Sequence, residues 1–288
     1  MSNAKWFALV GFLLSCQWMF AQMLPEAPVA PLVATPAEPG GTNAPESLAG
    51  PLAEAAEVLM KAGKPADARE KWLGALAAKP DEALRVKVET RLGEVNLELI
   101  RKPWPMAEKV DYVVQAGDSV RSIANKFGTT VELIVQANEM KRPDIINPGK
   151  RLRVFSGKMA VTVSKSCNEL LLTSNGRFFK RYRVGTGKYD RTPAGTFAVN
   201  DRIKEPVWWR DDGKTIPFGD KENILGTRWL AMKATGTTPA VTGYGIHGTW
   251  DNDSIGKSES AGCIRMKNAD VEELFELIPV GTAVTIEE

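Results

Sequence analysis

Residues 244–249 read YGIHGT and residues 260–266 read SAGCIRM, and these two stretches decide the fold of the C-terminal part of the chain. Each is a short apolar run bounded by glycine, where the backbone can approach a bound substrate closely. The first run carries His247, and the second carries Cys263. His247 is the only histidine among the 288 residues. Any imidazole chemistry in this chain must therefore pass through His247.

A thiol and an imidazole side by side are suited to acyl transfer. A free thiol with a pKa of about 8.5 is mostly protonated at neutral pH. A neighbouring imidazole can take that proton, which leaves a thiolate that attacks acyl carbon, and can then protonate a leaving amine. Gly262 lets the N–H groups around Cys263 turn towards a tetrahedral oxyanion. One Cys and one His are weak evidence by themselves, because a buried structural cysteine is the commoner case.

From residue 159 onward the composition becomes β-rich, with short apolar runs separated by turn residues. Asn175-Gly176 stands between two of these runs and is a strong hairpin signal. We therefore expect a mostly β domain over residues 159–288. The runs that predict strands are residues 161–163, 170–172, 178–184 and 196–199.

Further motifs accompany the pair: residues 184–187 (VGTG), 192–197 (TPAGTF), 225–230 (LGTRWL), 246–249 (IHGT), 254–256 (SIG), 260–266 (SAGCIRM) and 281–284 (GTAV), with Asn268 and Asp270 behind the cysteine. Together they resemble the L,D-transpeptidase family of the bacterial cell wall, in its YkuD-type catalytic domain. The resemblance extends over the whole of the predicted β domain. It implies a β-sandwich-like, mostly β fold with a helix at residues 270–278.

The resemblance also implies roles for individual residues. Cys263 would be the nucleophile and His247 the general base. The N–H groups of Gly262 and Cys263 would hold the oxyanion. The remaining residues predicted to form the substrate pocket are Ser260, Arg265, Gly248 and Thr249. No cofactor and no metal is expected, since one histidine and three cysteines leave few ligands for a zinc site.

One position departs from the pattern. Many family members carry a second histidine immediately before the Gly-Cys pair, whereas this chain has Ala261. The resemblance leaves the group that orients His247 open: a backbone carbonyl near Gly248 or Thr249, or the carboxylate of Asp251 or Asp253.

Two other features carry alternative interpretations. Cys167 is predicted to be free and structural, because a disulfide to Cys263 would abolish the nucleophile. Trp208, Trp209 and Trp229 could form an exposed platform that stacks on sugars or peptides, or could be ordinary core aromatics.

Residues 110–156 predict a small βααβ module. Residues 112–114 alternate as a strand, Ser119 caps a first helix with an apolar face, and Thr130 opens a second helix over residues 131–138. A strand at residues 152–154 closes the module. This order resembles a LysM domain, which implies binding of glycans that contain N-acetylglucosamine, such as peptidoglycan. The alternative is a stable spacer without a ligand.

Residues 52–102 have helical spacing and resemble a tetratricopeptide repeat in Leu59, Ala68, Trp72, Ala75 and Pro80. We expect a helical hairpin, with a turn at residues 63–65, followed by a third helix at residues 82–100. The segment is interpreted as an α-helical, TPR-like spacer or as a docking site for a protein partner.

The segment 1–21 at the N-terminus predicts export. Lys5 precedes an apolar run from Trp6 to Phe20, which is too short to span a bilayer and is typical of a signal peptide. Cleavage after Ala21 and lipidation at Cys16 remain alternatives. Residues 22–51 are rich in proline and alanine and predict an extended linker.

The overall composition excludes other classes. Lys and Arg total 37 and Asp and Glu total 35, so the net charge of +2 offers no basic surface for nucleic acid. No transmembrane span is expected. The predicted function is an exported, periplasmic or envelope-located L,D-transpeptidase that acts on peptidoglycan stem peptides and forms 3-3 cross-links, anchored to glycan strands by LysM. The alternatives are an L,D-carboxypeptidase, a transpeptidase that attaches a lipoprotein, and a non-catalytic scaffold.

Overall fold

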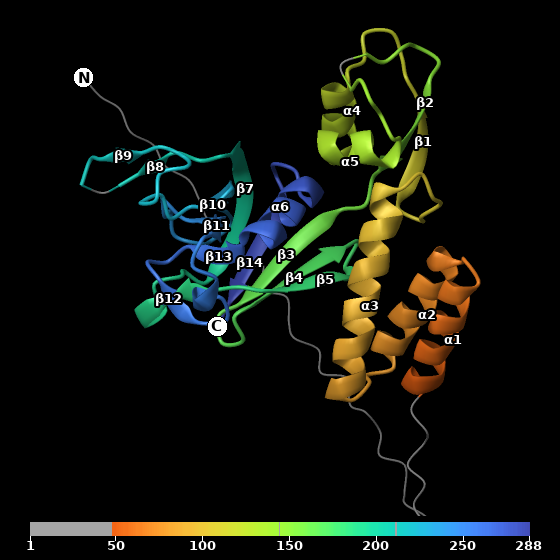
Figure 1. The fold of residues 1–288 in the computed structure, drawn as a ribbon, viewed down its shortest axis with the longest axis horizontal. Helices are drawn as coiled ribbons and strands as arrows, with labels where there is room; N and C mark the ends of the chain where they lie inside the picture. The colour runs from red at the N-terminus through yellow and green to blue at the C-terminus, as the bar shows by residue number, and fades with distance from the viewer. Residues whose placement is uncertain (1–47, 144, 211) are drawn as a thin grey trace, which may run out of the picture. The chain divides into compact units, whose positions relative to one another are not determined.

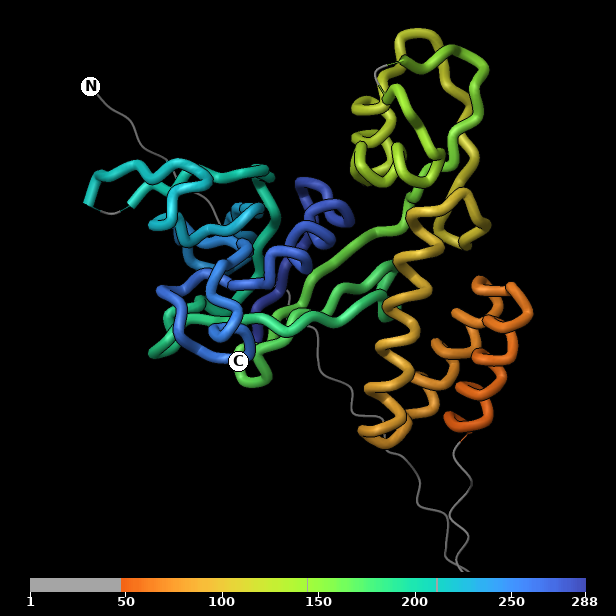
Figure 2. The backbone as a smooth tube through the Cα atoms, viewed as in Figure 1, coloured from red at the N-terminus to blue at the C-terminus, as the bar shows by residue number. Residues whose placement is uncertain are grey.

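The computed structural model describes residues 48–288 except Asp144 and Asp211. The predicted signal peptide, Cys16 and most of the predicted linker lie outside the described residues. Within the described part, no helix combines the length and the apolar character needed to cross a bilayer. The backbone can be followed through the βααβ module into the C-terminal sheet in Figure 2.

Three helices open the described chain. The first begins three residues before the predicted start, and Pro51 lies within its first turn, where the missing N–H breaks no intrahelical hydrogen bond. Gly63 turns the chain with a positive φ of 70°. Asp81 caps the third helix by accepting a hydrogen bond from the N–H of Leu84. The bounds are α1 Ala49–Lys61, α2 Pro65–Ala77 and α3 Glu82–Arg101.

Helix α3 runs along the edge strand of the large sheet (Figure 1). Trp72 of α2, Leu92 of α3 and Phe179 of the edge strand are buried in one continuous hydrophobic cluster. A spacer would keep its own separate core. The helices instead cover the sheet edge, so they are part of the same packed body as the sheet.

The βααβ order predicted for the second module is confirmed. Ser119 and Ser122 form a reciprocal capping box at the first helix, and Thr130 caps the second. The first strand begins three residues before the predicted start. The module has its own small core, which includes Ile123, Ile134 and Leu152. Its elements are β1 Lys109–Val113, α4 Val120–Phe127, α5 Val131–Ala137 and β2 Arg151–Phe155.

Eight strands of the C-terminal domain lie in one mixed sheet with the order β13-β11-β10-β7-β14-β3-β4-β5. The mostly β class is confirmed. The sandwich-like arrangement is replaced by this single sheet, a near-barrel, because parallel pairing of β14 with β3 joins the two halves edge to edge. The bounds are β3 Met159–Ser164, β4 Glu169–Ser174, β5 Arg177–Arg183, β7 Gly195–Lys204, β10 Arg228–Ala234, β11 Gly245–Thr249, β13 Ile264–Lys267 and β14 Ala283–Glu287.

The hairpin predicted at Asn175-Gly176 joins β4 to β5, and both residues have positive φ, as a type I′ turn requires. Helix α6, which was predicted at residues 270–278, covers β11 and β10. The short elements are β6 Thr186–Gly187, η1 Lys188–Asp190, β8 Trp208–Trp209, β9 Thr215–Ile216, η2 Asn252–Ser254, β12 Ser258–Ser260 and α6 Asn268–Leu277.

Candidate active site

Parallel pairing of β11 with β13 brings the two sequence motifs together. His247 lies opposite Arg265, and Ile246 lies opposite Ile264. The residues that precede this isoleucine pair, Gly245 and Cys263, therefore also lie side by side. Side chains alternate along a strand, so Cys263, Arg265 and His247 share one face, while the two isoleucines point into the core. The topology therefore places thiol and imidazole on the same side of adjacent strands.

His247 is held by its own backbone neighbourhood. Only 3% of the residue is exposed, and its Nδ1 lies 2.6 Å from the carbonyl oxygen of Gly248. A carbonyl can only accept, so Nδ1 carries the proton and the lone pair is on Nε2. The carbonyl is thus one of the orienting groups that the sequence left open. Asp251 and Asp253 are exposed in the turn that follows β11.

Burial fixes the charge state of His247. It lowers the pKa of the imidazole to about 4, and the positive charge of Arg265 lowers it further, against the carbonyls of Gly248 and Leu225. The ring is neutral at pH 7. A neutral Nε2 is the form that can accept a proton.

Trp229 forms a wall of the site. Its indole stacks on the imidazole of His247, with ring centroids 5.6 Å apart and planes at 26°. A Cβ on Gly245 would lie 2.7 Å from the indole, so the close approach of the ring requires glycine there. Trp208 and Trp209 behave differently: Arg210 lies over the ring of Trp208, and Trp209 is 75% exposed. The three tryptophans therefore do not form one platform.

The thiol of Cys263 is half-buried and bound to backbone groups. It lies 3.5 Å from the carbonyl oxygen of Gly243, to which it donates. Burial raises the pKa of Cys263, and the N–H of Gly245 and the charge of Arg265 oppose that rise. The thiol is protonated at pH 7 and is not a preformed thiolate. Attack therefore requires a base at the moment of reaction.

The turn that carries the nucleophile is held by Ser260. Its hydroxyl accepts a hydrogen bond from the Gly262 N–H at 3.0 Å and donates one to the Cys263 carbonyl at 2.6 Å. The Gly262 N–H, one of the two predicted oxyanion donors, is therefore already engaged by the Ser260 hydroxyl. Among the described residues, none accepts a hydrogen bond from the N–H of Cys263.

Gly248 and Thr249 shape the framework of the site. A Cβ on Gly248 would lie 2.2 Å from Oδ1 of Asn268, which accepts a hydrogen bond from the N–H of Thr227. Thr249 is buried, and its hydroxyl accepts a hydrogen bond from the N–H of Asp251. Both residues thus fix the strand end that carries His247.

Thr192 is a buried residue of the site to which the sequence interpretation gave no role. It is 1% exposed, and its hydroxyl donates to the Gly262 carbonyl at 2.8 Å. The same hydroxyl accepts a hydrogen bond from the N–H of Gly187 at 2.7 Å. The only available signal was its place at the start of the TPAGTF motif.

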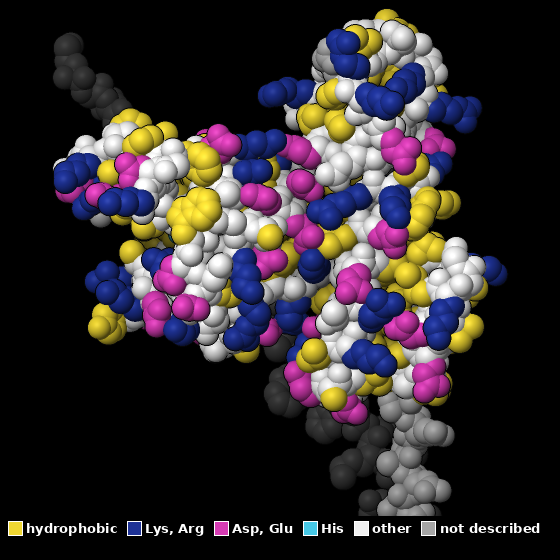
Figure 3. Space-filling model, viewed as in Figure 1, with side chains coloured by type: hydrophobic (Ala, Val, Ile, Leu, Met, Phe, Trp, Pro, Cys, Tyr) yellow, Lys and Arg dark blue, Asp and Glu magenta, His cyan; other side chains and the backbone are white. Residues whose placement is uncertain are grey.

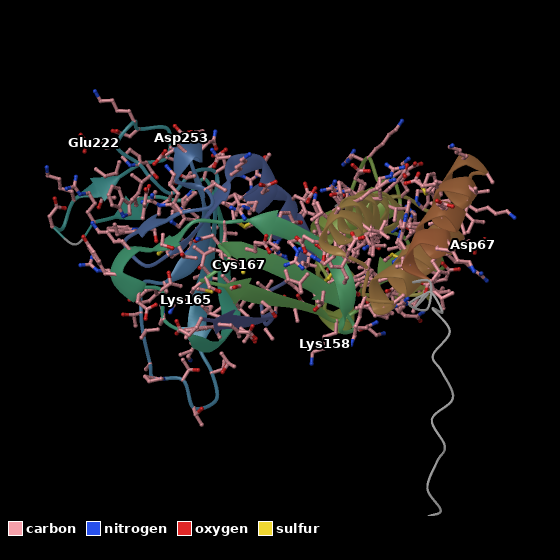
Figure 4. The ribbon with its side chains drawn as sticks, turned by 90° about the horizontal axis from the view of Figure 1, so that it is seen from below. Asp67, Lys158, Lys165, Cys167, Glu222 and Asp253 are labelled. Carbon is pink, nitrogen blue, oxygen red and sulfur yellow. The ribbon has the colours of Figure 1, made fainter. Side chains whose placement is uncertain are left out.

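Cys167 is free, as predicted, but it is exposed in the turn between β3 and β4 and does not contribute to the core as a structural cysteine would. Figure 4 labels it close to Lys165 of the same turn. Tight turns lie at the surface because their backbone groups need water as a partner.

Two family models match the chain. The L,D-transpeptidase catalytic domain matches residues 158–286, and the LysM domain matches residues 112–155. The candidate L,D-transpeptidase YqjB of Bacillus subtilis is 43% identical over 131 residues, which cover 45% of this chain and 72% of that protein. The candidate L,D-transpeptidase YkuD of the same organism is 34% identical over 182 residues, covering 61% of this chain and 97% of that protein.

Proposed function

The chain belongs to the L,D-transpeptidase family, with a LysM domain N-terminal to the catalytic domain, and on this basis we propose that it cross-links peptidoglycan through a thioester on Cys263. The observation that carries the proposal is the register of β11 and β13, which places Cys263 and His247 on one face. The reaction proposed is formation of 3-3 cross-links between stem peptides.

In the first half-reaction, Nε2 of His247 takes the thiol proton as Sγ of Cys263 attacks the carbonyl carbon of the third stem residue. The Cys263 N–H donates to the oxyanion. When the intermediate collapses, the bond to the terminal D-alanine breaks, and the imidazolium protonates the leaving amine. The acyl group remains on sulfur as a thioester.

In the second half-reaction, an amine of a second stem peptide attacks the thioester. His247 takes the proton of that amine, and the thiolate leaves and is reprotonated. Water in place of the amine would make the protein an L,D-carboxypeptidase, and an amine of a lipoprotein would make it an attachment enzyme. The three outcomes differ only in the acyl acceptor.

Mass spectrometry of purified muropeptides incubated with the protein tests the proposal. We expect a cross-linked dimer with loss of one D-alanine, and an acyl adduct on the peptide that contains Cys263. Cys263→Ala should abolish both. Cys167→Ala is the matched control, since it removes an exposed thiol outside the site. Product formation by Cys263→Ala would contradict the mechanism, and wild-type protein that yields no adduct would favour the scaffold alternative.

We propose that the LysM domain anchors the enzyme to glycan strands. The support is the family match and the complete βααβ module with its own core. The full chain should sediment with insoluble peptidoglycan and be released by chitin oligomers, and Cys263→Ala should sediment equally well. Sedimentation that chitin oligomers leave unchanged would contradict anchoring by this domain.

The other parts of the chain have proposed roles that follow from the sequence. The N-terminal segment 1–21 would direct export to the periplasm or envelope, with cleavage after Ala21 or lipidation at Cys16. The α1–α2 hairpin would be TPR-like, since Ala68, Trp72 and Ala75 are buried between its helices and α3. Its outer surface is the proposed place for a protein partner.

A further inference from the structure

Two hydroxyl groups, those of Ser260 and Thr192, form hydrogen bonds with the backbone of the turn that carries Cys263. The hydroxyl of Ser260, the last residue of β12, accepts a hydrogen bond from the N–H of Gly262 and donates one to the carbonyl of Cys263. Thr192, which is 70 residues away in the sequence, holds the carbonyl of Gly262. The hydroxyl of Thr192 also accepts the N–H of Gly187, so both its donor and its acceptor functions are used. It is therefore fixed in one rotamer.

The hydrogen bond from Thr192 to the Gly262 carbonyl also fixes the orientation of the N–H of Cys263. A peptide unit is planar and trans, so the carbonyl of Gly262 and the N–H of Cys263 lie in one plane and point in opposite directions. Fixing the carbonyl oxygen fixes the direction of that N–H. Since Ser260 occupies the N–H of Gly262, the N–H of Cys263 is the remaining one of the two predicted oxyanion donors.

Close backbone packing is what brings Thr192 within reach. A Cβ on Gly187 would lie 2.9 Å from Cα of Gly262 and 2.8 Å from N of Thr192. Gly262 has a positive φ of 140°, and a Cβ there would lie 2.7 Å from the ring of Tyr244. The segment at residues 187–192 and the nucleophile turn therefore touch without side chains between them.

We propose that Thr192 is a positioning residue that aims the Cys263 N–H at the carbonyl oxygen of the bound acyl donor. The proposal rests on the acyl-transfer function given above. Thr192 touches neither substrate nor sulfur in this role: it acts through the Gly262–Cys263 peptide plane.

Two reactions of the same thiol separate this role from a general structural one. Alkylation by iodoacetamide is displacement at a saturated carbon and develops no oxyanion. Acylation by p-nitrophenyl acetate passes through a tetrahedral oxyanion and expels p-nitrophenol, leaving an acetyl thioester. Only acylation should depend on the direction of the Cys263 N–H.

The test uses the full chain and measures both rates at Cys263 by peptide mapping. Thr192→Val keeps the shape of the side chain but removes the hydroxyl. We expect the acylation rate to fall by about 10- to 100-fold, which is no more than the fall in rate when a whole oxyanion donor is removed. Alkylation should stay unchanged. Thr192→Ser should restore acylation. Thr196→Val is the matched control. It also removes a hydroxyl that donates to a backbone carbonyl, that of Thr235, but Thr196 lies on an exposed part of β7.

Acylation of Thr192→Val at the wild-type rate, or an equal fall in both rates, would overturn the proposal. If Thr192→Val does not fold, Thr192→Ala takes its place with the same two expected outcomes, and a folded Thr192→Ser that does not acylate also overturns it. Failure of the wild-type protein to acylate at all would instead count against the proposed function, so the two failures are distinguishable.

Discussion

His247 and Cys263 are both uncharged at neutral pH, because burial acts on the two groups in opposite directions. It lowers the pKa of the imidazole to about 4 and raises that of the thiol. The resting site is therefore a neutral pair, and the proton moves only when the thiol attacks. This differs from sites in which a preformed thiolate waits beside an imidazolium.

We expect the rate of acylation at Cys263 to depend on pH through the protonation of His247. The imidazole accepts a proton only in its neutral form, so acylation should stay constant from about pH 7 to pH 5 and fall as the pH drops through about 4. The pH profile of acylation by p-nitrophenyl acetate measures this, and His247→Ala should lose the acid limb along with most of its rate. A midpoint near the ordinary histidine pKa of about 6.5 would contradict a buried, neutral base.

The second prediction concerns the two described thiols. Cys167 is exposed, whereas Cys263 is half-buried and its pKa is raised. Iodoacetamide should therefore label Cys167 faster than Cys263 at pH 7, and labelling of Cys263 should increase as the pH rises towards and beyond 9. Peptide mapping reads both sites in one sample. Faster labelling of Cys263 at pH 7 would show that its thiolate is preformed.

At the scale of elements, a buried ion pair ties α2 to the segment before β1. Arg69 is 2% exposed; its guanidinium bonds both carboxylate oxygens of Glu108, and its Nε donates to Oδ1 of Asn96 at 2.6 Å. The amide of Asn96 donates in turn to the carbonyl of Phe179 on β5. One polar network therefore joins α2, which carries Arg69, to α3, which carries Asn96, and to the edge strand β5.

Removing Glu108 should be costly, because the buried guanidinium of Arg69 then keeps only the half-exposed carboxylate of Glu70 as a charged partner. We expect Glu108→Ala to lower the free energy of unfolding by about 3–5 kcal/mol. Glu70→Ala is the matched control: Glu70 also contacts Arg69, but its side chain is 51% exposed, and a loss of at most about 1 kcal/mol is expected. Urea unfolding of the two variants measures the difference. Equal losses would contradict a network stabilised by burial.

At the scale of the whole molecule, the three described modules pack against one another. The hydroxyl of Thr130 in the LysM domain donates to the carbonyl of Glu276 in α6, and Glu132 pairs with Lys204 of β7 at 3.0 Å. Lys, Arg, Asp and Glu side chains are interspersed on the surface, as Figure 3 shows for one face. On that face the two signs of charge alternate and form no single-sign patch, and the Glu132–Lys204 pair links two modules.

Because the core is continuous from the helices into the sheet, we expect both to unfold together. Trp72 reports on the helices and Trp229 on the sheet. The chain has eight tryptophans, so the fluorescence lost on Trp72→Phe, taken as the difference from the wild-type urea transition, follows the helices, and the fluorescence lost on Trp229→Phe follows the sheet. Each variant's fluorescence and circular dichroism transitions should coincide. A helix signal that is lost at lower urea, ahead of the loss of strand structure, would show that the helices are a separate unit.

The sequence alone was sufficient for the features that depend on local chemistry. Capping residues such as Ser119 and Thr130 and the Asn175-Gly176 turn act through short-range contacts, so α4, α5 and the β4–β5 hairpin form where predicted. Strands β1 and β7 are longer than the runs that predicted them. The Gly-Cys motif, the lone histidine and the flanking motifs together indicated the family, because acyl transfer by a thiol needs an imidazole close to it in space.

Only the tertiary structure decided what depends on neighbours distant in the chain. The direction of the pKa shift at Cys263, the engagement of the Gly262 N–H and the exposure of Cys167 follow from burial and from partners that no local pattern specifies. Thr192 meets Gly262 across 70 residues, and α3 meets β5 across an even longer stretch. Long-range contacts of this kind arise when the sheet closes and the helices cover its edge, and sequence periodicity carries no record of them.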